Sequence, residues 1–281
     1  QQGLQEIIAP LPTLSGRLWV RLDTFNVILY PFVEGQNGWD VALSEEQWMV
    51  FGRTLKRIHS LDLPADLKAR IPHENYSPYW REEVKQFQRQ VEHTYFADPA
   101  AAGLAQLLKE KQAVINHLIK RAEDLGAILQ SQTTSEVLCH TDIHMGNLLI
   151  CEDGALYIVD WDQPILAPKE RDLMFINSGI GHAWLEPEQE EALFYAGYGQ
   201  IEINPVALAY YRYERIVQDF AAYGEQLFLT DEGGEDRAEG LRRVASQFLP
   251  GAVIDIAYRT EKRLPPELQT EWVQADGKLF G

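Results

Sequence analysis

The feature that most limits how this chain can fold is the stretch VLCHTDIHMGNLLICEDGALYIVDWDQP, residues 137–164. A short apolar segment leads into a polar loop, and two more apolar segments then flank the turn-forming residues EDG. Short apolar runs on either side of a tight turn are typical of an antiparallel β-hairpin. The stretch therefore predicts a strand, a loop and a hairpin in direct succession.

The segments around this stretch are mostly helical in pattern. Residues 17–30, RLWVRLDTFNVILY, alternate apolar and polar positions around Asp23, which predicts a short hairpin. Apolar residues at helical spacing predict helices over residues 44–59, 80–89, 104–130 and 205–228, whereas residues 161–173 and 230–240 are expected to be irregular. The expected fold class is α+β, with a small β piece followed by a mostly helical body into which a β-hairpin is inserted.

Charge and composition exclude several classes of partner. The chain has 25 basic and 42 acidic residues and a formal charge of −17, which disfavours nucleic acid and anionic membranes and favours a cationic small molecule. No apolar run approaches the ~20 residues of a membrane span, and no signal-peptide pattern opens the chain. Cys139 and Cys151 are too few for a disulfide framework, so reduced structural thiols are expected. A cytoplasmic protein is expected, and no obligate protein partner is inferred.

The loop in the central stretch permits two chemical interpretations. His140, Asp142 and His144 stand at alternate positions, as ligands of a zinc or two-metal hydrolase site often do. Such a site needs further ligands, and none of the other five histidines stands in a motif with ligand spacing. A metal hydrolase would also hold zinc tightly in the absence of nucleotide, and we expect no such zinc.

The second interpretation uses Asp142, Asn147 and Asp160. Phosphoryl transfer needs a carboxylate to orient and deprotonate the acceptor hydroxyl, and oxygen ligands that hold Mg²⁺ on the phosphates. Kinases place the base and the metal-binding Asn five residues apart and add an Asp after a hairpin, and these three residues have that arrangement. The alternative is structural: Asp and Asn are also common in turns and at strand ends.

Several motifs carry a family resemblance. HTDIHMGN resembles the catalytic loop of the aminoglycoside phosphotransferases, and IVDWD resembles their metal-binding segment. ILYPFVEG, YSPYWRE, APKERDLMFI and YYRYERIVQDFAAYG are similar to the spectinomycin phosphotransferase branch, so that the resemblance covers roughly residues 7–228. It implies a protein-kinase-like fold and transfer from ATP, or GTP, with Mg²⁺ to a hydroxyl of an aminocyclitol antibiotic, which confers resistance.

The resemblance also implies roles for individual residues. Asp142 would be the catalytic base, with Asn147 and Asp160 as metal ligands. His140 would brace the loop, and Asp172 in ERDL would hold the loop in place. His144 is assigned no chemistry. Asp162 is kept as a secondary contributor, and the residues expected to face adenine at the hinge are Pro31, Phe32, Val33 and Glu34.

The acceptor is expected over the helices that follow. Tyr210 and Glu214 share one face of the predicted helix over residues 205–228, while Tyr213, Val217, Phe220 and Gly224 share a face expected to be core. Glu214 and Asp219 could pair with ammonium groups of a cationic ligand. Trp184 is a weaker candidate, and a solvated surface is the alternative for each.

The amino-terminal part departs from the kinase pattern. A kinase covers the phosphates with a Gly-rich loop and pairs them with a strand lysine. Before residue 35 the chain has only Gly3 and Gly16 and no lysine, the first being Lys56. We therefore expect residues 1–34 to be a remnant of the N-terminal lobe with the hinge, and residues 35–281 to form the catalytic and substrate-binding lobe. Either the sequence, which opens with Gln1, is incomplete upstream, or the protein is a ligand-binding kinase homologue without efficient catalysis.

Overall fold

The computed structural model describes residues 3–177 and 185–270. Two compact units divide the chain, and each is built from two separate segments. Unit 1 consists of residues 1–72 and 137–201, and unit 2 consists of residues 73–136 and 202–281. The chain therefore crosses between the units three times. No helix among the described residues combines the length and the apolar character needed to cross a bilayer.

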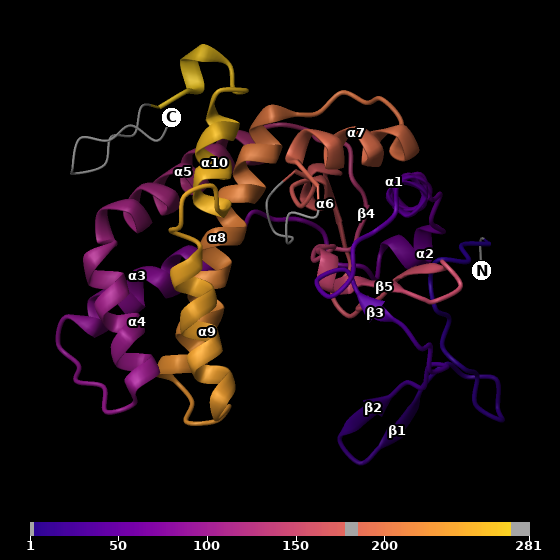
Figure 1. Cartoon of the computed structure of the whole chain (residues 1–281), viewed down its shortest axis with the longest axis horizontal. Helices are drawn as coiled ribbons and strands as arrows, with labels where there is room; N and C mark the ends of the chain where they lie inside the picture. The colour runs from indigo at the N-terminus through magenta and orange to yellow at the C-terminus, as the bar shows by residue number, and fades with distance from the viewer. Residues whose placement is uncertain (1–2, 178–184, 271–281) are drawn as a thin grey trace. The chain divides into compact units, whose positions relative to one another are not determined.

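The described residues of unit 1 form three small antiparallel sheets (Figure 1). The first is the predicted N-terminal hairpin, and the second pairs strands in the order β3-β5-β6, with Leu149 opposite both Asn37 and Tyr157. In the third, β4 pairs with β7. The strands are β1 (Val20–Leu22), β2 (Phe25–Val27), β3 (Gln36–Asn37), β4 (Val137–Cys139), β5 (Leu148–Ile150), β6 (Leu156–Ile158) and β7 (Ile165–Ala167).

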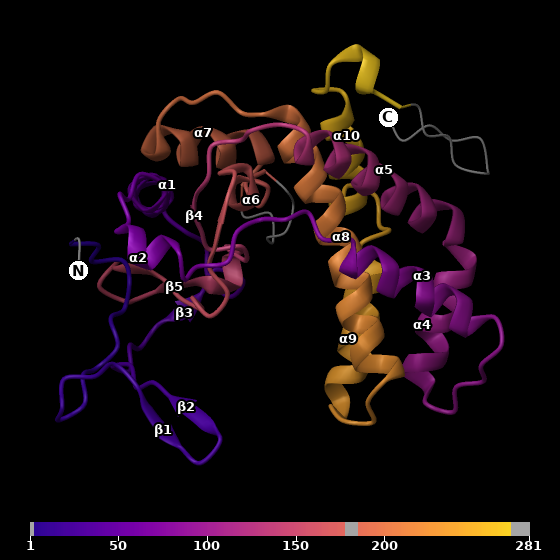
Figure 2. The ribbon, with the colours of Figure 1, turned by 180° about the vertical axis from the view of Figure 1, so that it is seen from behind.

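The helices of unit 1 are α1 (Glu45–His59), α2 (Ala65–Lys68), α6 (Glu170–Leu173) and α7 (Pro187–Tyr198), with the 3₁₀ turn η1 (Met145–Asn147). The start of α1 follows from a capping box, in which Ser44 and Gln47 exchange side-chain and backbone hydrogen bonds. The helices α1 and α7 pack side by side, as Figures 1 and 2 both show. Their buried face includes Phe51, Leu55 and Phe194.

Two glycines permit the close approach of α1 and α7. A Cβ atom at Gly52 would collide with the carbonyl oxygen of Phe194, and one at Gly197 would collide with the carbonyl oxygen of Met49. Backbone atoms cannot move aside as a flexible side chain can. The packing of this unit therefore requires that both positions lack a side chain.

Alanine at Gly52 should therefore destabilise the protein by about 1–3 kcal/mol, the usual cost of overpacking, even though alanine favours helices. Denaturant unfolding measures this change. The matched control is Gly103→Ala, also within a helix, where the added Cβ meets only the side chain of Leu241, which can move aside. Equal stabilities of the two variants would contradict the packing argument.

Unit 2 is helical, and α8 (Pro205–Phe228) is its central element (Figure 1). It begins where Asn204 caps the N–H groups of Val206 and Ala207. The other elements are α3 (Tyr79–Val91), α4 (Pro99–Glu110), α5 (Gln112–Gln130), α9 (Glu235–Ser246), α10 (Val253–Glu261) and the 3₁₀ turn η2 (Pro266–Leu268), and all five helices contact α8.

The core of unit 2 includes a buried ion pair between α5 and α10. The predicted apolar face of α8 is confirmed, since Tyr213, Val217, Phe220 and Gly224 are all buried. Glu261 in α10 accepts two hydrogen bonds from Arg121 in α5, at 2.6 and 3.0 Å, and a third from the Tyr213 hydroxyl at 2.9 Å. This network joins three helices of the unit.

Several sequence expectations need correction. The single helix expected over residues 104–130 is two helices, α4 and α5, separated at Lys111. Residues 161–173 are not wholly irregular, because they contain β7 and α6. The loop expected over residues 230–240 ends at Gly234, where α9 begins. The strand β3 was not anticipated, and the N-terminal hairpin exposes apolar side chains on both strands, Leu22 and Phe25 among them.

Candidate active site

The loop between β4 and β5 carries the predicted catalytic residues. It leaves β4 at Cys139, adopts a left-handed conformation at Thr141 (φ 78°) and ends in the 3₁₀ turn that contains Asn147. Positive φ is unfavourable for a β-branched residue, so the surrounding contacts must hold Thr141 in place. Its backbone N–H and its hydroxyl are both hydrogen-bonded, the hydroxyl to the carbonyl oxygen of Gln163 at 3.2 Å.

Asp172 fixes the start of this loop through hydrogen bonds to its backbone. Its carboxylate is fully buried and accepts the backbone N–H groups of His140 (2.9 Å) and Thr141 (2.7 Å). It also lies 3.0 Å from Nε2 of His59 in α1. Burial alone would raise the pKa of Asp172, but the hydrogen bond and charge of His59 and the two backbone N–H groups outweigh it and lower the pKa. The geometry is that of a loop anchored on one buried carboxylate.

The same buried region also places the sulfur of Cys139 near His59 and Asp172, with the possible ligand atoms within 4.8 Å of one another. Both nitrogens of the His59 ring are already engaged, Nδ1 with the Tyr198 hydroxyl at 2.7 Å and Nε2 with Asp172. The group is thus a hydrogen-bonded network that links α1, α7 and the loop. It has no ring nitrogen to offer a metal in this arrangement.

His140 connects the loop to the end of the hairpin. Its Nε2 lies 2.8 Å from the carbonyl oxygen of Val159, and its Nδ1 accepts the backbone N–H of Asp142 at 3.3 Å. Trp161 packs edge-on against the imidazole, with ring centroids 4.6 Å apart. A single buried ring therefore couples the backbone at Asp142 to the residue before Asp160.

The two residues predicted as metal ligands, Asn147 and Asp160, lie on either side of the β5–β6 hairpin. The side-chain N–H of Asn147 donates to the carbonyl oxygen of Asp142 at 2.8 Å, which leaves the amide oxygen of Asn147 as an acceptor for a cation. Asp160 comes two residues after β6, in a left-handed conformation (φ 67°). The structure therefore brings Asp142, Asn147 and the segment of Asp160 together through direct hydrogen bonds.

The electrostatics around Asp160 suit a divalent cation. Partial desolvation raises the pKa of Asp160, and the carboxylates of Asp162 and Asp142 raise it further, while His140 opposes them. Clustered carboxylates repel one another, and a bound cation would remove that cost. The donors are all hard oxygen atoms, which is the set that Mg²⁺ prefers. These residues therefore fit a magnesium ion.

The remaining predicted residues belong to other segments of the chain. Pro31, Phe32, Val33 and Glu34 form an irregular segment just before β3, the strand that pairs with β5. Trp184 lies outside the described residues. Tyr210, Glu214 and Asp219 all belong to α8 in unit 2, and Asp162 belongs to unit 1 with the loop.

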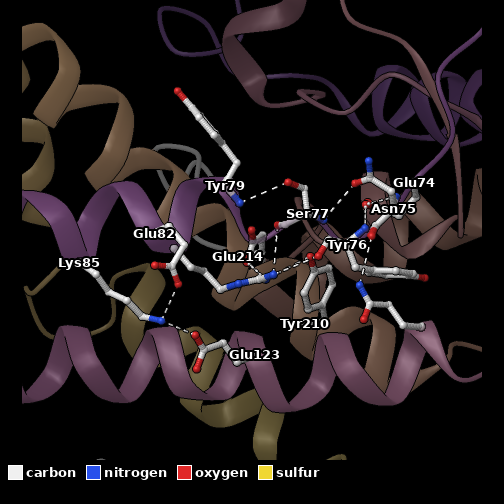
Figure 3. Close-up of polar contacts among 12 residues, drawn as sticks. Glu74, Asn75, Tyr76, Ser77, Tyr79, Glu82, Lys85, Glu123, Tyr210 and Glu214 are labelled. Atoms are coloured by element: carbon white, nitrogen blue, oxygen red, sulfur yellow. Dashed lines mark hydrogen bonds and ion pairs between the residues drawn. The ribbon is translucent and has the colours of Figure 1, made fainter.

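Glu214 is engaged within its own unit. Its carboxylate lies 2.6 Å from the guanidinium of Arg81 in α3, and both side chains are largely buried. Arg81 also donates to the hydroxyl of Tyr210 and to the backbone carbonyls of Tyr76 and Ser77. Figure 3 shows Glu214 and Tyr210 beside the segment that carries Tyr76 and Ser77. The sequence gives no signal for this ion pair, because its members are 133 positions apart.

Asp219 is likewise paired, with Arg215 at 3.0 Å and with the side chain of Gln247 at 2.9 Å.

The sequence analysis did not predict the role of His59, the partner of Asp172. It stands 113 positions from Asp172, and at the end of a helix a histidine has no pattern that marks it as a partner.

Comparison with known proteins shows the family of the chain. A model of the phosphotransferase enzyme family matches residues 8–204. The chain belongs to this family, and its fold is protein-kinase-like, rich in helices with a few small sheets.

Several known proteins within this family and fold are similar to the chain. The crystal structure of spectinomycin phosphotransferase APH(9)-Ia in complex with ADP and spectinomycin is 39% identical, with a TM-score of 0.85 over 92% of this chain and 79% of that chain. An aminoglycoside phosphotransferase from Alicyclobacillus acidocaldarius, 15% identical with a TM-score of 0.59 over 93% of this chain and 79% of that chain, shares the fold. Protein StrN from Streptomyces griseus is 26% identical over 190 residues, which are 65% of this chain and 58% of StrN. The matched part thus spans little more than half the length of StrN.

Proposed function

We propose that this protein transfers the γ-phosphoryl group of ATP, or GTP, to a hydroxyl of a spectinomycin-like aminocyclitol and so confers resistance to it. The observation that carries the proposal is the joint anchoring of the loop and the hairpin, in which His140 and Asn147 hold Asp142 beside the segment of Asp160. The likeness to an enzyme solved with ADP and spectinomycin supports the choice of donor and acceptor.

The proposed step needs one proton acceptor and one cation site. Asp142 accepts the proton of the acceptor hydroxyl. The hydroxyl oxygen bonds to the γ-phosphorus, and the bond between the γ-phosphorus and the leaving oxygen of ADP breaks. Asn147 and Asp160 would hold Mg²⁺, which would supply positive charge to offset that of the phosphates. Asp162 stands near the same site as a further carboxylate. Asp172 and His140 act on the backbone of the loop and keep these groups in register.

The acceptor is a cationic small molecule in this proposal. The formal charge of −17 favours such a molecule, and spectinomycin carries amino groups. We propose Tyr210, Glu214, Asp219 and Trp184 as candidate acceptor-binding residues. Glu214 and Asp219 already pair with Arg81 and Arg215, so an ammonium group of the acceptor would compete with these arginines for the two carboxylates.

The proposal assigns residues 1–34 to an N-terminal lobe and residues 35–281 to the catalytic and substrate-binding lobe. Pro31, Phe32, Val33 and Glu34 would meet adenine with backbone groups. We propose a cytoplasmic location, because ATP is the phosphate donor in the proposed reaction.

Mass spectrometry of spectinomycin incubated with the protein, ATP and Mg²⁺ tests the acceptor. We expect a product that carries one added phosphate and does not form without Mg²⁺. If phosphate is transferred to none of spectinomycin, other aminoglycosides or macrolides, the antibiotic assignment is wrong. ATP turnover with a metabolite alcohol in that case would identify a kinase of another small-molecule hydroxyl.

A further inference from the structure

His144 lies in the loop between Asp142 and Asn147, and the proposed reaction gives it no part. Its Nδ1 accepts the backbone N–H of Gly146 at 3.0 Å, and this bond caps the 3₁₀ turn η1. A nitrogen that accepts a hydrogen bond carries no proton in the neutral ring, so the proton of His144 is on Nε2. That Nε2 lies 3.7 Å from Oδ2 of Asp142. The loop therefore directs an N–H donor at the carboxylate of the proposed base.

Two aromatic rings fix the orientation of this imidazole. The ring of Trp39 lies at 5.7 Å between centroids, tilted by 44°, and the ring of Phe175 lies edge-on at 6.4 Å. Gly146 leaves room for the indole, because a Cβ at this position would collide with Nε1 of Trp39. The His144 side chain is only 22% exposed. The imidazole is thus held by packing as well as by its hydrogen bond.

The segment that carries Trp39 is itself tied to the loop. The N–H of Gly38 donates to the carbonyl oxygens of Met145 (2.9 Å) and Leu148 (3.2 Å), and the N–H of Trp39 donates to the side chain of Asn37 at 2.8 Å. Asn37 belongs to β3, which pairs with β5 immediately after the loop. The backbone on both sides of His144 is therefore fixed relative to Trp39.

We propose that His144 is a positioning residue for the base, with its Nε2–H holding Oδ2 of Asp142 so that Oδ1 faces the acceptor hydroxyl. The inference rests on the proposed function, in which Asp142 takes the proton of that hydroxyl. A separation of 3.7 Å is longer than a hydrogen bond, so the proposed contact requires the Asp142 side chain to rotate toward His144 when the acceptor binds. A carboxylate held by a second group loses less orientational freedom when the acceptor binds, which increases the fraction of productive complexes.

The test uses His144→Asn. Asparagine is a good N-cap and can still accept the N–H of Gly146, but its shorter side chain does not reach Asp142. We expect kcat for phosphate transfer to fall by about 10- to 100-fold, with KM for ATP and acceptor unchanged. His144→Gln, whose amide N–H can reach further, should recover part of the loss. The control is His93→Asn, the same change at an exposed histidine of unit 2, which should leave kcat unchanged.

Each outcome decides a different point. Thermal unfolding verifies that the variants fold. A fall in kcat in His144→Asn that His144→Gln partly recovers would support the N–H contact, whereas an equal fall in both variants would contradict it. An unchanged kcat in His144→Asn, in a protein where Asp142→Asn does lose activity, would overturn the inference and leave the proposed function intact. If Asp142→Asn itself retains full activity, the proposed function fails first. In the double variant with Asp142→Asn and His144→Asn, the second change should have no further effect on kcat, because both changes act through the Asp142 carboxylate.

Discussion

Asp142→Asn should lower the rate of phosphate transfer by about 10²- to 10⁴-fold, the usual contribution of a general base. Asparagine has the same shape and can keep the hydrogen bonds of the backbone at this position, but its amide cannot take up a proton. The Asp142 side chain is 39% exposed, so the substitution should leave the fold unchanged. Nucleotide affinity should also be retained, because the predicted metal ligands are Asn147 and Asp160.

Steady-state transfer rates, nucleotide binding and denaturant unfolding would be compared for this variant and Asp153→Asn. Asp153 lies in the exposed turn of the hairpin and accepts the N–H of Ala155 at 3.0 Å, a bond that asparagine can also accept. Both variants therefore make the same chemical change in neighbouring segments. Equal transfer rates in the two variants would show that Asp142 is not the base.

Asp172→Ala should have the largest effect on stability, about 3–5 kcal/mol of unfolding free energy, and should also abolish transfer. The carboxylate is fully buried and accepts hydrogen bonds from the backbone of His140 and Thr141 and from the ring of His59. Its removal leaves these donors buried without an acceptor, which costs more than the lost bonds themselves. It also releases Thr141 from its left-handed conformation, so that the loop would lose its geometry.

The pH dependence of this effect has a definite sign. The pKa of Asp172 is lower in the folded protein than in the unfolded chain, so its contribution is present above the unfolded value of about 4. The contribution is lost as the pH falls through the folded pKa. The stability difference between the unaltered protein and Asp172→Ala should thus narrow in acid.

Denaturant unfolding at neutral and acidic pH measures the difference. Asp172→Asn should fall between the two proteins, because its amide oxygen can still accept one backbone N–H. The control is Asp62→Ala, since the Asp62 side chain is wholly exposed and only 3.7 Å from Lys68 in a solvated pair. A loss in Asp172→Ala as small as that of the control would refute the anchoring role of Asp172.

Local patterns in the sequence predict the central motif well. The loop, the hairpin and the capped start of α1 each depend on residues within a few positions of one another, which is the range over which turn and cap chemistry acts. The buried face of α8 follows from helical spacing in the same way.

Other features depend on contacts between distant segments, which the spacing of residues in the sequence does not predict. The strands β3 and β7 are only two and three residues long, and they exist because β5 and β4 pair with them. The break at Lys111 has no glycine or proline to mark it. The pairs His59 with Asp172 and Arg81 with Glu214 join distant segments, so they emerge only in the folded units.

The central proposal is that Asp142, Asn147 and Asp160 form one centre for phosphoryl transfer. The most direct measurement is single-turnover transfer of a labelled γ-phosphoryl group from ATP to spectinomycin in the presence of Mg²⁺, made in parallel on the unaltered protein and on Asp142→Asn, Asn147→Ala and Asp160→Asn. We predict labelled spectinomycin from the unaltered protein and a loss of at least about 10²-fold in each variant, with raised Mg²⁺ requirement only for Asn147→Ala and Asp160→Asn. Transfer at the unaltered rate by all three variants would contradict the proposal.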